Sequence, residues 1–143
     1  MAIVYFDSSA FVKLLIDEDG SDIAAQLWDA ADAVVSSRLA YPEVRAALAA
    51  AARAGRLTSA GGREAEDGWE EFWAATRAVE LSGRVADSAG GLAKRWALRG
   101  ADAVHLASAL ALGKHDVVFA TWDDRLSTGS VAAGLRVIPS MAM

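Results

Sequence analysis

Two short apolar runs, each closed by an aspartate, place the strongest constraint on the fold of this chain. Residues 2–6 (Ala-Ile-Val-Tyr-Phe) lead into Asp7, and residues 117–122 (Val-Val-Phe-Ala-Thr-Trp) lead into Asp123. Apolar runs of this length are typical of buried strands. If the two strands are parallel neighbours in an open sheet, both aspartates lie at its carboxyl edge, where open α/β sheets bind their ligands.

Strand-like and helix-like patterns alternate along the whole chain without a linker. The order βααβααβααββ predicts an α/β fold, with one domain over residues 1–143 and a mostly parallel central sheet flanked by helices. Ser21 is the expected N-cap of the second helix. The expected strands cover residues 2–6, 33–36, 78–81, 117–120 and 135–138. The expected helices cover residues 8–16, 21–30, 39–54, 58–77, 83–98 and 102–112, and residues 123–133 form a loop or a short helix.

The composition excludes several classes of protein. The 143 residues suit one domain with a core of its own, and 54% of them are hydrophobic. No apolar run approaches the roughly 18 residues of a membrane-spanning helix, and the N-terminus lacks the basic segment and cleavage site of a secretory signal. The chain has no cysteine, which excludes disulfides, thiolate metal sites and a cysteine nucleophile. We therefore expect a cytoplasmic protein with no membrane contact.

The net charge of −5 argues against tight, non-specific binding to DNA, because phosphate binding normally leaves a basic footprint. The acidity is compatible with brief contact to RNA, since a bound divalent cation would reverse the local charge of an acidic site. The basic residues are also clustered. They form one group around the expected third helix (Arg38, Arg45, Arg53 and Arg56) and another just before Asp102 (Lys94, Arg95 and Arg99).

Four acidic residues stand at the ends of strands or the starts of helices. Besides Asp7 and Asp123, Glu43 and Asp102 lie in the first turns of two Ala/Leu-rich stretches. Four carboxylates in one crevice repel each other, so at neutral pH they must bind protons or a cation. Hard divalent cations prefer oxygen ligands. The pattern therefore predicts a divalent-metal site and chemistry on phosphate.

Four motifs that contain these acids occur in a characteristic order and spacing. They are Asp7-Ser8-Ser9-Ala10, Tyr41-Pro42-Glu43-Val44-Arg45-Ala46-Ala47-Leu48, Arg99-Gly100-Ala101-Asp102-Ala103-Val104-His105-Leu106-Ala107 and Thr121-Trp122-Asp123-Asp124-Arg125-Leu126. Together they resemble the PIN-domain ribonucleases, and closely the VapC toxins of bacterial type II toxin–antitoxin systems. The resemblance extends over essentially the whole chain. It departs from the family at Gly61-Gly62 and Gly90-Gly91, which fall in segments that are normally helical.

The resemblance implies a metal-dependent endoribonuclease with Mg²⁺ as cofactor and Mn²⁺ as an alternative. Asp7, Glu43, Asp102 and Asp123 match the acidic quartet that holds the metal for cleavage of RNA phosphodiesters. Asp7 and Asp102, followed by Asp123, are the implied metal ligands. Glu43 would act through a metal-bound water or position the attacking water, because Mg²⁺ takes only one or two protein carboxylates directly.

Other side chains near the acids have two interpretations each. Ser9 and Thr121 carry short hydroxyls suited to orienting the carboxylates without binding the metal. Asp124 adjoins Asp123, but Asp123 holds the T-x-D position and is preferred. His105 invites an acid–base role, yet its packed helical surroundings favour a structural histidine.

The tryptophans also have a structural and a functional interpretation. Trp69, Phe72 and Trp73 form an aromatic stripe at helical spacing, which is most often core or subunit interface. Trp122 adjoins Asp123 and is the best candidate for stacking on a base of single-stranded RNA.

The resemblance also implies partners: an RNA substrate (tRNA, rRNA or mRNA), a cognate VapB-type antitoxin, and a second copy of the chain in a homodimer within a larger complex. An apolar part of the antitoxin would pack on the aromatic stripe or on the first-helix face of Phe11, Leu14 and Leu15. An arginine or lysine of the antitoxin would reach Asp7 and Asp102, since arginine pairs carboxylates with two parallel bonds.

Three other functions compete with a toxin. A PIN nuclease of housekeeping RNA processing, or one that acts on DNA, would have the same acids but usually further domains. A receiver-type phosphoacceptor is disfavoured, because Asp7 is followed by Ser8-Ser9 rather than by a second acid and no lysine follows position 121. A non-catalytic binding module has no reason to keep four mutually repelling carboxylates.

Overall fold

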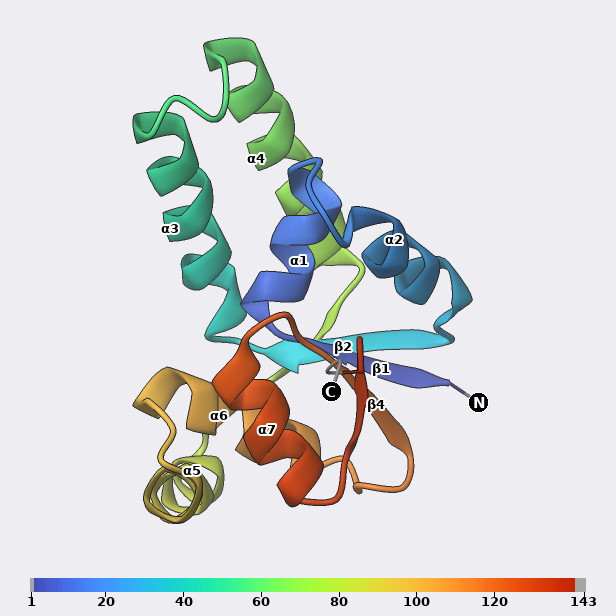
Figure 1. Ribbon diagram of the computed structural model, residues 1–143, viewed down its shortest axis with the longest axis vertical. Coiled ribbons are helices and arrows are strands. Elements are labelled where there is room, and N and C mark those ends of the chain that lie inside the picture. The colour runs from blue at the N-terminus through green and yellow to red at the C-terminus, as the bar shows by residue number, and fades with distance from the viewer. Residues whose placement is uncertain (1, 141–143) are drawn as a thin grey trace.

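Five parallel strands form a single sheet at the centre of the structure (Figure 1). The computed structural model describes residues 2–140. The strands are β1 (Ile3–Phe6), β2 (Ala33–Ser37), β3 (Arg77–Val79), β4 (Val117–Ala120) and β5 (Arg136–Ile138). Their order is β3-β2-β1-β4-β5, and each neighbouring pair is parallel. The predicted α/β fold with a mostly parallel sheet is confirmed.

Helices cover both faces of the sheet. They are α1 (Ser8–Leu15), α2 (Ser21–Ala30), α3 (Ala40–Arg53), α4 (Ser59–Ala74), α5 (Gly83–Trp96), α6 (Gly100–Leu110) and α7 (Asp124–Ala132). Helices α1 to α4 lie on one side and α5 to α7 on the other (Figure 1). Successive side chains of a strand point to opposite faces. Val4 and Phe6 of β1 therefore join the core under α1 to α4, and Tyr5 joins the core under α5 to α7.

The strand order reverses between β1 and β4, and this reversal places the candidate site. From β1 the chain continues to β2 and β3 on one side, and β4 and β5 lie on the other side. Phe6 pairs with Ala120 at the carboxyl ends of the two central strands. The next residue, Asp7, donates its backbone N–H to the Ala120 carbonyl at 3.2 Å. Ligands of open α/β sheets bind at such a switch point, so the strand order brings the start of α1 and the start of α7 together there.

Gly20, not Ser21, is the N-cap of α2, which corrects the sequence prediction. Gly20 has φ of 95°, and a Cβ built on it would lie 2.5 Å from Nε1 of Trp122. Ser21 instead stabilises the preceding loop: its hydroxyl donates to the Ile16 carbonyl at 3.0 Å and accepts from the Glu18 N–H at 3.0 Å. The glycine is needed both for its backbone conformation and for the close approach of the indole.

The other boundaries differ from the predicted ones by a few residues. Helix α4 ends at Ala74, and Arg77 joins the edge strand β3 because it pairs with Val35 of β2. Helix α6 begins at Gly100 with Arg99 as N-cap, so Asp102 lies inside its first turn. The segment left open as a loop or short helix is the helix α7.

The glycine pair at positions 90 and 91 does not interrupt α5, because both positions are exposed and open space surrounds them. No helix within residues 2–140 is both long enough and apolar enough to cross a membrane.

Candidate active site

Asp7 is the most buried of the four acids, with only 3% of its surface exposed. It caps α1, because its Oδ1 accepts a hydrogen bond from the Ala10 N–H at 2.9 Å. The Ser9 hydroxyl donates to the same oxygen at 2.6 Å, and the Thr121 hydroxyl donates to Oδ2 at 2.5 Å. Burial raises the pKa of the Asp7 carboxyl above its usual value. A bound cation would stabilise the charged form of this carboxyl.

Two hydroxyls join the ends of β1 and β4. Thr121 Oγ1, which donates to Asp7, also accepts from the Asp123 N–H at 3.0 Å. Ser9 Oγ likewise accepts from the Trp122 N–H at 2.9 Å. Both hydroxyls therefore hold the Asp7 carboxylate against the segment that carries Asp123. Their part in catalysis stays a prediction.

Arg99 bridges two of the other acids. Its Nε lies 3.0 Å from Asp102 Oδ2, and a terminal nitrogen lies 3.3 Å from Asp123 Oδ2. Asp123 also caps α7, because its Oδ1 accepts from the Leu126 N–H at 2.8 Å. The sequence reasoning placed Arg99 only in a basic cluster. Its position three residues before Asp102 on a helix start is the signal that identifies the contact.

Glu43 is held by a histidine from the opposite face of the sheet. Glu43 lies in the first turn of α3, and its Oε1 is 2.6 Å from Nε2 of His105 on α6. The other ring nitrogen, Nδ1, lies 2.7 Å from the Tyr5 hydroxyl. His105 is buried, as a structural histidine would be, but it also contacts one of the four acids. Its spacing of one turn after Asp102 did not predict this contact, because Glu43 is 62 residues away.

The structure brings the four acids to one edge of the sheet. Arg99 has a raised pKa, first because it hydrogen-bonds to Asp102 and further because of the charges of Asp123 and Glu43. Asp7 adjoins Asp123 through the shared threonine hydroxyl. Within residues 2–140, no three acidic or histidine side chains converge into a ready-made cage for an ion. Magnesium keeps several waters and takes one or two carboxylates, so this set of oxygen donors fits it without a closed cage.

Known proteins share both the sequence and the fold. The PIN-domain family model matches residues 4–128. The chain belongs to the PIN-domain family. Ribonuclease VapC45 of Mycobacterium tuberculosis is 64% identical over 140 residues, which cover 98% of this chain and 97% of that protein. This identity places the chain in the VapC branch, and the resemblance inferred from the motifs is confirmed.

Two solved structures share the PIN fold at lower identity. A crystal structure of a Pyrobaculum aerophilum protein superposes with a TM-score of 0.69 at 22% identity, over 96% of this chain and 92% of that one. A chain of a toxin–antitoxin complex from Klebsiella pneumoniae superposes with a TM-score of 0.64 at 18% identity, over 100% of both chains. The two likenesses show that the same fold is kept at low sequence identity.

Trp122 and Asp124 of this PIN domain lie next to the acids but make other contacts. The half-buried Trp122 indole packs against Gly20, and the Lys13 ammonium lies 5.9 Å from its ring centroid. The stacking of Trp122 on an RNA base stays a prediction. Asp124 is exposed and lines a surface hollow with Trp96 and Arg125.

Two of the six residues of the predicted partner surface lie in the core of the PIN domain. Trp69 and Phe11 are fully buried and pack edge-to-face with ring centroids 4.9 Å apart. Neither ring is available to a partner, which corrects that part of the prediction. Leu14, Leu15 and Phe72 instead line two adjoining hollows formed by α1, α4 and their neighbours.

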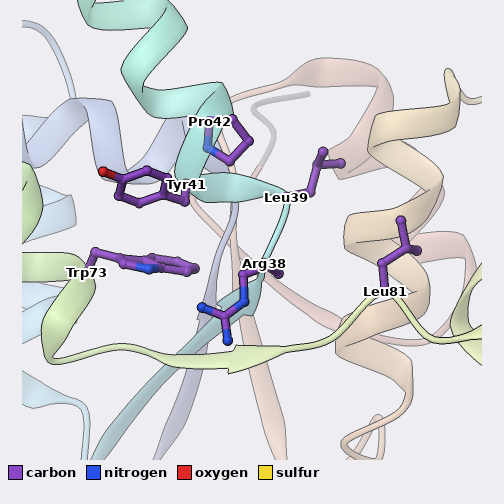
Figure 2. A pocket seen from close by; sticks show the side chains of 6 residues that line it. All are labelled: Arg38, Leu39, Tyr41, Pro42, Trp73 and Leu81. Carbon is purple, nitrogen blue, oxygen red and sulfur yellow. The ribbon is translucent and has the colours of Figure 1, made fainter.

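A further groove lies at the start of α3, the helix that carries Glu43. It has a volume of about 440 Å³ and is lined by Arg38, Leu39, Tyr41, Pro42, Trp73 and Leu81. Figure 2 shows the Tyr41 and Trp73 rings on one side, the two leucines on the other and Arg38 between them. The Arg38 guanidinium lies 5.9 Å from the Trp73 ring centroid. The groove thus combines aromatic surface with the Arg38 cation. Pro42, which lines the groove, directly precedes Glu43 in the sequence.

Proposed function

We propose that this chain is a divalent-metal-dependent endoribonuclease and the toxin of a type II toxin–antitoxin pair. One observation carries the proposal: Asp7, Glu43, Asp102 and Asp123 lie together at the switch point of a PIN-domain sheet. Asp7 is the most buried member of this group, held by three hydrogen-bond donors. The 64% identity to a protein named ribonuclease VapC45 supports the same activity.

Asp7, Asp102 and Asp123 would hold Mg²⁺ or Mn²⁺. When bound, the ion would polarise a phosphate oxygen and lower the pKa of a bound water. Ser9 and Thr121 would keep the Asp7 carboxylate in place, because each hydroxyl is fixed by a second hydrogen bond to the β4 end. Arg99 would leave the two aspartates as the ion arrives, and its exposed guanidinium would then be free to contact a phosphate of the RNA.

Glu43 would position the attacking water. Its Oε1 is occupied by His105, which leaves Oε2 to accept a hydrogen bond from the water. The RNA would be single-stranded near the scissile bond, because only splayed bases offer their faces to aromatic side chains. The groove at the start of α3 presents the Tyr41 and Trp73 rings for this purpose, with Arg38 as a stacking and phosphate-binding cation.

A VapB-type antitoxin would cover the two hollows lined by Leu14, Leu15 and Phe72 and extend a cation to the acids. The cation would take the place that Arg99 holds in this structure, between Asp102 and Asp123. Homodimers of the toxin would assemble with the antitoxin into a larger cytoplasmic complex. Expression of the chain alone should then arrest growth, and co-expression of the neighbouring antitoxin reading frame should restore it.

The activity can be tested with purified protein and a pool of end-labelled ribo-oligonucleotides. We expect internal cleavage with Mg²⁺ or Mn²⁺ and none with EDTA. Asp7→Asn, Asp102→Asn and Glu43→Gln should each lower the rate by about 100-fold or more, because each removes a ligand or a water-positioning group while keeping its shape. Asp124→Asn is the matched control, since it makes the same change at an exposed neighbour. Undiminished cleavage by Asp7→Asn, in a preparation free of other nucleases, would refute the assignment.

A further inference from the structure

A continuous chain of hydrogen bonds links the backbone of β2 to the carboxylate of Glu43. The Ser37 N–H donates to the Tyr5 hydroxyl at 3.0 Å. That hydroxyl lies 2.7 Å from His105 Nδ1, and His105 Nε2 lies 2.6 Å from Glu43 Oε1. The four residues come from β2, β1, α6 and α3. The chain therefore crosses the sheet and connects both helical layers.

The hydrogen bonds of this series can all run in one direction, with each donor on the Ser37 side and each acceptor on the Glu43 side. A backbone N–H can only donate, so the Tyr5 oxygen accepts from Ser37 and keeps its own proton for another partner. Tyr5 is fully buried, and burial raises the pKa of its hydroxyl far above the ordinary value, so the phenol stays protonated. If the Tyr5 proton is donated to His105 Nδ1, 2.7 Å away, Nδ1 is the unprotonated nitrogen. The ring proton is then on Nε2, from which it can be donated to Glu43 Oε1.

The surroundings of His105 exclude a direct role in proton transfer to substrate. The ring is almost completely buried, and both of its nitrogens have partners inside the protein. The Tyr5 ring stacks on Phe119 with centroids 5.0 Å apart, so the hydroxyl has a fixed direction. Glu43, by contrast, is 26% exposed and would otherwise be free to change rotamer. Among the four residues linked by these hydrogen bonds, only Glu43 thus presents a side-chain group, its carboxylate, to solvent.

We infer that His105 is a positioning residue for the proposed nuclease, and that Tyr5 selects the tautomer with which His105 holds Glu43. One carboxylate oxygen is fixed by the imidazole, and the other is presented to the attacking water. The inference rests on the proposed function and extends it, because it assigns roles to two buried residues outside the acidic quartet. Groups that orient a site in this way commonly contribute about 10- to 100-fold to its activity.

The first test is spectroscopic and needs neither metal nor RNA. The chain has two histidines, and the second, His115, is exposed, so a His115→Gln variant assigns the ring signals of His105. Nitrogen-15 NMR of the metal-free protein should show the His105 ring proton on Nε2. In Tyr5→Phe the preference should weaken, because Nδ1 loses its donor. A ring with the proton on Nδ1 in the unmodified protein would overturn the inference.

The second test is kinetic. Tyr5→Phe and His105→Leu should lower kcat by about 10- to 100-fold, while KM for the RNA and the affinity for Mn²⁺ stay within about twofold. His105→Gln should recover part of kcat, because its amide N–H can reach the Glu43 carboxylate as Nε2–H does. His105→Gln also carries the test if Tyr5→Phe fails to fold. Folded Tyr5→Phe and His105→Leu variants with an unchanged kcat would overturn the positioning role.

Failure of the inference differs from failure of the proposed function. If the unmodified protein cleaves no RNA, the proposed function fails together with the catalytic part of the inference, while the NMR spectrum still decides whether the hydrogen-bond chain exists. If cleavage depends on Asp7 but not on His105, the nuclease is retained and the positioning role is wrong.

Discussion

Replacing Asp7 with asparagine should make the metal-free protein more stable while it abolishes cleavage. The carboxyl is almost completely buried, and burial raises its pKa above the ordinary value of 3.8. The folded state therefore destabilises the charged form. Asparagine has no charge to bury, and it caps a helix about as well as aspartate does. The amide oxygen can take the place of Oδ1 and keep the Ala10 N–H and the Ser9 hydroxyl as donors, while the Thr121 hydroxyl, which now donates to Oδ2, can rotate to accept from the amide NH₂.

The sign and the pH window follow from the same pKa shift. Above the folded-state pKa, the native carboxylate is charged and buried while the unfolded one is charged and hydrated, so the penalty is fully present. As the pH falls through the folded-state pKa, the native group takes up a proton before the unfolded one does, and the penalty disappears. Each unit of raised pKa corresponds to about 1.4 kcal/mol. In a domain near this size, 1 kcal/mol moves Tm by roughly 2–4 °C.

Thermal unfolding in EDTA measures this effect. We expect Asp7→Asn to melt several degrees above the unmodified protein at pH 7 to 8, and the difference to shrink toward the acidic end of the range. Mn²⁺ should act in the opposite sense. At a hundredfold excess over Kd it should stabilise the unmodified protein by about 2.7 kcal/mol, and it should leave the variant almost unchanged. Asp124→Asn, which alters an exposed neighbour, should show neither effect.

Two outcomes would refute the reasoning about Asp7. One is a metal-free variant that melts below the unmodified protein at neutral pH, which would mean that the three hydrogen bonds outweigh the cost of burial. The other is an unmodified protein whose melting temperature does not respond to Mn²⁺, which would remove the metal site that the buried carboxylate is proposed to serve.

Three further perturbations probe the other parts of the structure. Arg99→Ala should bind Mn²⁺ more tightly in a calorimetric titration, because the guanidinium that bridges Asp102 and Asp123 no longer competes for their carboxylates; weaker binding would contradict that competition. Gly20→Ala should lower the free energy of unfolding in urea by about 1–3 kcal/mol, since φ is 95° there and the new Cβ would meet the Trp122 indole at 2.5 Å. Its control, Gly90→Ala in the exposed middle of α5, should raise stability by roughly 0.5–1 kcal/mol, and equal effects at the two glycines would speak against the contact. Leu14→Glu, in the hollows beside α1, should weaken capture of the co-expressed antitoxin by at least about tenfold and leave RNA cleavage intact; an undisturbed complex would place the antitoxin elsewhere.

The sequence by itself indicated where the strands lie. It also indicated that Asp7 and Asp123 each follow the carboxyl end of a strand. A continuous apolar run of four to six residues is typical of a strand covered on both faces, and such strands occur in parallel sheets. Asp7 and Asp123 end two such runs, so the sequence predicted a shared carboxyl edge on the condition that the two strands were neighbours. The structure meets that condition, because Phe6 pairs with Ala120. The Gly90-Gly91 departure proved harmless because a helix tolerates glycine at exposed positions.

Only the tertiary structure decided which side chains touch across the sheet. Hydrophobic periodicity predicts that Trp69 and Phe11 face inward or toward a partner, but it does not say which, and the structure buries both. The cap at Gly20 depends on Trp122, which is about a hundred residues away in the sequence. The link between His105 and Glu43 likewise spans 62 residues. The spacing of hydrophobic residues shows which side of a single helix or strand is buried. Contacts between different helices and strands depend instead on the order of the strands in the sheet. That order is selected by the packing of the whole core.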